Sequence, residues 1–128
     1  MADRLKALRR IEKVQADMAK LAEWRIAVAE QRIAALAKDR AGLADYVTAE
    51  GGLGVPLAKA ALRSMLAIDR RSAEAERIRA IEREKLGALR RRERVVAAAV
   101  GVAEREARAA ADAAELAAIM EAWLAQRG

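Results

Sequence analysis

The strongest helix-breaking signal in this chain is the run Glu50-Gly51-Gly52-Leu53-Gly54-Val55-Pro56. It holds three of the seven glycines and the only proline among 128 residues. Glycine after a helix supplies a left-handed cap, and proline is tolerated in the first turn of the next helix. We therefore expect one helix at about 3–49, a turn at 50–56 and a second helix at about 57–126. Elsewhere Gly42, Gly87 and Gly101 weaken a helix by about 1 kcal/mol each relative to alanine, which does not stop it.

A heptad pattern runs through the first of these helices. Its positions step by three and four residues without a slip, which is typical of a coiled-coil seam. The second half of the pattern is apolar, whereas Glu12 and Gln15 interrupt the first half. The predicted seam positions are Leu5, Leu8, Glu12, Gln15, Ala19, Ala22, Ile26, Ala29, Ile33, Leu36, Arg40, Leu43 and Val47.

The second helix carries a longer pattern of the same kind. A strict seven-residue repeat sustained over many turns predicts a left-handed supercoil, and alanine at the seam lets two helices approach closely. The predicted positions are Ala58, Ala61, Met65, Ile68, Ser72, Ala75, Arg79, Glu82, Leu86, Leu89, Glu93, Val96, Val100, Ala103, Ala107, Ala110, Ala114, Ala117, Glu121 and Leu124.

The short turn leaves only an antiparallel return, so the fold class is all-α, a coiled-coil hairpin of two long helices. The helices would be about 70 and 105 Å long, at 1.5 Å per residue. The part of the second helix after roughly Gly101 then has no partner in the chain. The sequence does not fix the register, and the alternatives one heptad apart each bury some of Arg79, Glu82 and Glu93.

Each helix also carries a second apolar row, which indicates contact on more than one side. We therefore expect self-association, or stabilisation by a partner along the overhanging part of the second helix. The rows are Ile11, Val14, Met18, Leu21 and Val28 in the first helix and Ile81, Ala88, Val95, Val102, Ala109, Leu116 and Trp123 in the second.

The composition argues against an enzyme and against a metal or cofactor site. Hydrophobic residues make up 55% of the chain, aromatic residues only 2%, and charged residues 34%, a balance typical of long helices. Cys and His are absent, and hydroxyl side chains are few, so nucleophiles, bases and the usual metal ligands are scarce. The glycines of the turn lack the Lys-Ser/Thr of a phosphate-binding loop. No signal peptide or membrane span is evident, which predicts a cytoplasmic protein.

The net charge of +6 is concentrated in the middle of the chain. Residues 51–100 contain twelve Lys or Arg and six Asp or Glu. In an antiparallel hairpin the basic run of the second helix would return to about the level of that in the first. This predicts a basic collar that binds an acidic protein surface; a merely solvated face is the alternative. Nucleic acid is disfavoured, because no aromatic residues are placed to stack on bases and acids interleave throughout. The collar residues are Arg9, Arg10, Lys13, Arg90, Arg91, Arg92 and Arg94.

The layout of two long helices, a small turn and an overhanging second helix resembles the flagellar export protein FliJ and its type III secretion counterparts. The likeness covers nearly the whole chain. The residues that carry it are Leu5-Lys6-Ala7-Leu8-Arg9-Arg10, Glu30-Gln31-Arg32-Ile33-Ala34-Ala35-Leu36 and Met120-Glu121-Ala122-Trp123.

The resemblance implies a role in protein transport for flagellum biogenesis, without enzymatic activity of its own. Such proteins act as a stalk on the axis of a hexameric export ATPase, stimulate ATP hydrolysis, and contact the export gate and export chaperones. The basic collar would meet the ATPase ring, in the cytoplasm beside an inner-membrane export apparatus. A structural scaffold that self-associates is the first alternative, and a basic nucleic-acid-binding protein the second. Apolar residues near the turn would meet the gate, namely Leu36, Leu43, Tyr46, Leu62 and Leu66.

Overall fold

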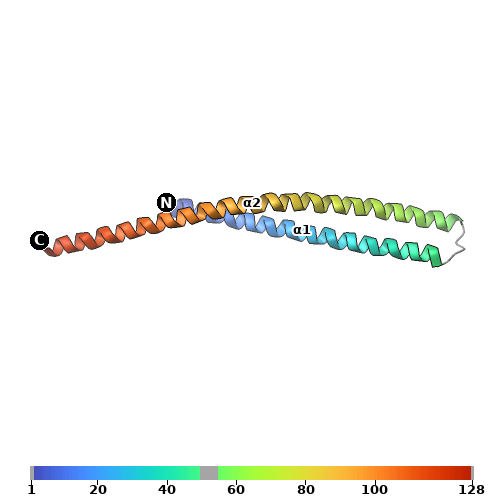
Figure 1. Cartoon of the computed structure of the whole chain (residues 1–128), viewed down its shortest axis with the longest axis horizontal. Helices are drawn as coiled ribbons and strands as arrows, with labels where there is room; N and C mark the ends of the chain where they lie inside the picture. Colours follow the sequence, from blue (N-terminus) through green and yellow to red (C-terminus); the bar gives the residue numbers. More distant parts are fainter. Residues whose placement is uncertain (1, 50–54, 128) are drawn as a thin grey trace. The chain divides into compact units, whose positions relative to one another are not determined.

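A computed structural model describes residues 2–49 and 55–127, and both segments are helical. Helix α1 spans Ala2–Ala49 and helix α2 spans Val55–Arg127, with no strand in the described segments (Figure 1). Pro56 is the second residue of α2, where first-turn amides have no partner within the helix and a missing N–H costs little. Residues 50–54 of the predicted turn lie outside the described residues. Helix α1 ends at Ala49 as predicted, and the other three helix ends differ from the predicted ones by one or two residues.

The two helices pack against each other in an all-α hairpin, as the sequence predicted. The chain divides into two compact units, each containing part of both helices. The turn-side unit is Ala19–Ala88, and the terminal unit comprises the residues up to Met18 and those from Leu89 onward.

In the turn-side unit, interhelical ion pairs establish the antiparallel register. Arg40 Nε donates to Asp69 Oδ1 at 2.8 Å, and Arg83 Nη2 donates to Glu30 Oε1 at 2.8 Å. Residue numbers therefore fall along α1 as they rise along α2. The core is the predicted seam, and half of its buried residues are alanines, whose small side chains allow two helices to approach closely. Its buried residues are Ala19, Ala22, Ala29, Leu36, Ile68, Ala75, Glu82 and Leu86.

The predicted seam of α1 is buried or half-buried at every position except Arg40. Arg40 is exposed, because its long side chain carries the guanidinium out of the seam to Asp69. Of the charged seam residues in α2, Glu82 is only 7% exposed, whereas Arg79 and Glu93 are half-buried. Glu82 Oε1 lies 3.7 Å from Arg25 Nη1 and 3.5 Å from Lys85 Nζ, while its Oε2 is buried without a hydrogen-bond partner.

In the terminal unit, Arg9 Nη2 donates to Glu104 Oε1 at 3.2 Å. The seam of α2 is buried at Leu89, Val100 and Ala103 and half-buried at Ala107. Pairing therefore continues about two turns beyond the predicted limit at Gly101. Every residue of α2 from Arg108 to Arg127 is exposed, and this end of α2 extends past the start of α1 (Figure 1). We call residues 108–127 the α2 tail.

Candidate protein-binding surfaces

The seven residues of the predicted basic collar all belong to the terminal unit, and all are exposed. α1 supplies Arg9, Arg10 and Lys13, and α2 supplies Arg90–Arg92 and Arg94. The two sets are staggered rather than level, because Arg9 pairs with Glu104, ten residues beyond Arg94 and about 15 Å along the helix. The predicted collar therefore consists of two staggered basic segments rather than one level ring.

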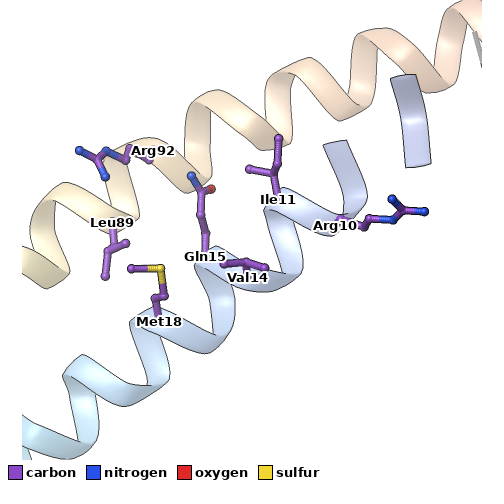
Figure 2. A pocket seen from close by; sticks show the side chains of 7 residues that line it. All are labelled: Arg10, Ile11, Val14, Gln15, Met18, Leu89 and Arg92. Atoms are coloured by element: carbon purple, nitrogen blue, oxygen red, sulfur yellow. The ribbon is translucent and has the colours of Figure 1, made fainter. Parts of the chain in front are cut away.

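An apolar groove of about 340 Å³ lies between the two helices of the terminal unit, beside Arg10 of one basic segment and Arg92 of the other (Figure 2). Ile11, Val14 and Met18 of α1 are each about half exposed there, and Leu89 of α2 lies opposite Met18. We call it the terminal groove. It is lined by Arg10, Ile11, Val14, Gln15, Met18, Leu89 and Arg92.

Arginine side chains flank the terminal groove on both helices. Figure 2 shows Arg10 and Arg92 pointing outward from α1 and α2, away from the apolar side chains between the helices. A groove with an apolar floor and cationic edges suits an amphipathic helix whose flanking residues are acidic. An acidic protein surface as the partner of this groove stays a prediction.

Gln15, which lines this groove, carries a buried polar atom that lowers the stability of the terminal unit. It occupies a predicted seam position, and its side-chain carbonyl oxygen Oε1 is buried without a hydrogen-bond partner. A buried polar atom without a partner costs stability. The terminal unit is therefore less tightly held than an all-apolar seam would make it.

The predicted gate-contacting residues belong to the turn-side unit, and their accessibility differs. Tyr46, Leu62 and Leu66 are all more than half exposed, and Leu62 and Leu66 share one face of α2 at a spacing of four. Leu43 is half-buried, and Leu36 is only 8% exposed because it packs in the seam. Leu36 is therefore not available to a partner unless the helices separate.

The structure also reveals a second groove, in the turn-side unit, which sequence analysis did not single out. It encloses about 140 Å³ between Trp24 and Val28 of α1 and Ile78 of α2, with Arg25 and Arg32 beside them. The sequence signal for this groove is the i, i+4 spacing of Trp24 and Val28, which places both on one face of α1.

Nearby on α2, Glu74 accepts a 2.7 Å hydrogen bond from Arg77, and this contact raises the pKa of the exposed Arg77 guanidinium above its ordinary value.

Models of known protein families, curated proteins and solved structures were all compared with the chain, and none matches. Among the described residues there is no cluster of three or more metal-ligating side chains. Within 2–49 and 55–127, neither helix contains a stretch apolar and long enough to cross a membrane.

Proposed function

We propose that the chain is a non-enzymatic coiled-coil stalk of a flagellar or type III export apparatus. In this proposal the basic collar binds and stimulates the hexameric export ATPase, and the exposed apolar residues of the turn-side unit contact the export gate or a chaperone. The protein would act in the cytoplasm, beside the membrane-embedded part of the apparatus. The proposal rests on the resemblance described above and on the surface chemistry of the two units.

One observation supports the ATPase contact above the others. All seven collar side chains are exposed in one unit, and two of them flank an exposed apolar groove. A cationic surface accelerates association with an acidic partner, and an apolar groove supplies the contact area that charge alone does not. A solvated basic face needs no such groove.

The gate contact is supported by Tyr46, Leu62 and Leu66 in the turn-side unit. Large apolar side chains that stay more than half exposed mark protein-binding surfaces when they gather on one face. Leu62 and Leu66 satisfy this condition, being one turn apart on α2.

The test is the rate of ATP hydrolysis by a purified export ATPase from the same organism, with and without the chain. Reversing Arg90, Arg91 and Arg92 to Glu should abolish stimulation, because three attractive contacts become repulsive. The matched control reverses Arg63, Arg70 and Arg71, which are exposed on the same helix in the turn-side unit. Circular dichroism should show equal helicity for all three proteins. Equal stimulation by both triple variants would refute the collar contact.

A self-associating scaffold remains the second candidate, because the whole α2 tail is exposed and carries large apolar side chains. Stable association of the chain with itself, without any effect on an ATPase, would favour it.

A further inference from the structure

The α2 tail carries an apolar stripe that nothing in the described chain covers. Its five large side chains follow the three-four spacing that places them on one face of a helix. Each is between 53% and 59% exposed. A continuous stripe of this kind on a helix projecting into water indicates a binding surface. The stripe consists of Leu116, Ile119, Met120, Trp123 and Leu124.

The middle of the tail is acidic, whereas the terminal groove has cationic edges. Residues 108–127 contain Asp112, Glu115 and Glu121 between two arginines, Arg108 and Arg127, which gives a net charge of −1; no basic residue lies within 109–126. Arg127, at the end of the tail, lies over the Trp123 ring at 4.5 Å from its centroid. The terminal groove is flanked by Arg10 and Arg92. The middle of the tail therefore combines an apolar stripe with acidic residues, the combination that the groove fits.

The groove side of α2 continues beyond the residues that line the groove itself. Val95 lies three residues after Arg92, and Val102 seven residues after Val95, so both share the side of α2 that carries Arg92. Val95 is 70% exposed and Val102 is 43% exposed. An apolar track thus runs along the paired part of the terminal unit.

The lengths of the tail and of this track also match. The tail, residues 108–127, is about 30 Å long, and the paired segment of α2, residues 89–107, is about 28 Å long. The tail cannot fold back onto its own groove, because α2 is one uninterrupted helix through both segments. A second copy of the chain can supply it.

We propose that the chain forms an antiparallel two-fold dimer in which the α2 tail of each copy occupies the terminal groove of the other. With the two-fold axis near Ala109, Met120 lies at about the level of the partner's Val14, and Glu115 at about the level of the partner's Arg10. Trp123 then reaches the level of the partner's Met18 and Val95. Each paired segment becomes a three-helix bundle, and the same contact is made twice, as two-fold symmetry requires.

The size of this interface fits a specific dimer. Stable interfaces bury roughly 1,200–2,000 Å² in total. Two helices, each about 30 Å long and about 10 Å across, that seat their apolar faces in grooves provide contact on this scale. The dimer goes beyond the proposed function and does not depend on it. Since it covers Arg10 and Arg92, it would compete with any acidic partner of the collar.

Disulfide cross-linking provides a direct test, because the chain has no cysteine of its own. Full-length Val14→Cys and Met120→Cys proteins, distinguished by a tag, should be mixed and oxidised. The proposal predicts a cross-linked heterodimer as the main product. Glu76→Cys, an exposed position in the turn-side unit, is the control and should not cross-link to Met120→Cys. Cross-linking of Met120→Cys mainly to itself would show tail-to-tail pairing and overturn the proposal.

Sedimentation equilibrium provides the second measurement. The wild-type chain should be dimeric at micromolar concentrations, and Trp123→Ala should raise the dissociation constant at least about tenfold. Arg10→Glu and Glu115→Arg should each weaken the dimer, and their combination should restore it. A wild-type chain that stays monomeric, or a double variant no better than either single one, would overturn the proposal. A dimer that forms while ATPase stimulation fails would refute only the proposed function.

Discussion

Replacing Glu82 by Leu should stabilise the hairpin. Glu82 occupies a seam position of α2, where it is 7% exposed, and its Oε2 atom has no hydrogen-bond partner. An unsatisfied buried polar atom costs about 1–3 kcal/mol. The ion pairs that Glu82 makes with Arg25 and Lys85 compensate this cost only weakly. The Arg25 and Lys85 nitrogens lie 3.7 and 3.5 Å from Glu82 Oε1, and both side chains are about half exposed. Such pairs contribute about 0–1 kcal/mol each.

The substitution removes these ion pairs and buries a leucine instead. Full burial of a leucine side chain contributes about 1.5–3 kcal/mol, and leucine and glutamate have similar helix propensities. After subtraction of the lost ion pairs, the free energy of unfolding should rise by about 1–3 kcal/mol. This agrees with the general finding that apolar replacement of a buried ion pair is often stabilising.

Urea unfolding, followed by circular dichroism at helical wavelengths, measures the difference. The matched control is Glu84→Leu, two residues away on the same helix and exposed, which should change the free energy of unfolding by less than about 0.5 kcal/mol. A Glu82→Leu chain less stable than the wild type would contradict this prediction. It would mean that the Arg25 and Lys85 contacts outweigh the cost of burying the carboxylate.

Three further changes test the packing. Gln15→Leu should raise the free energy of unfolding by about 1–2 kcal/mol in the same urea assay, because it removes the unpartnered buried Oε1. Gly42→Ala should stabilise α1 by about 1 kcal/mol, since a Cβ atom there meets nothing within 4 Å and alanine is the better helix former; no gain in the thermal midpoint would contradict this. A double-mutant cycle on Arg40 and Asp69 should give a coupling of less than about 1 kcal/mol, falling with added salt, because both side chains are 47% exposed.

The heptad repeat predicted the fold because it specifies which residues face the second helix. The glycine-rich stretch before Pro56 predicted a turn between two helices. The predicted seam positions of α2 from Ala58 to Ala107 are all buried or half-buried in the structure. The register was not predictable, since an alanine-rich seam shifted by one heptad buries nearly the same area. The structure fixes it through particular pairs, among them Arg83 with Glu30 and Arg9 with Glu104.

The candidate surfaces were only partly predictable for the same reason. The collar residues stand out in the sequence as basic runs, but the stagger between their two sets depends on the register. The terminal groove joins Met18 of α1 to Leu89 and Arg92 of α2, residues whose proximity no local pattern encodes. Leu36 was predicted as a gate contact, although its place in the seam already indicated burial.

The rate of ATP hydrolysis by a purified export ATPase tests the proposed function most directly. The full chain should raise this rate, and the chain with Arg90, Arg91 and Arg92 reversed to Glu should leave it at the basal level. A wild-type chain that leaves the rate unchanged at every concentration would contradict the proposal that this hairpin is an export stalk.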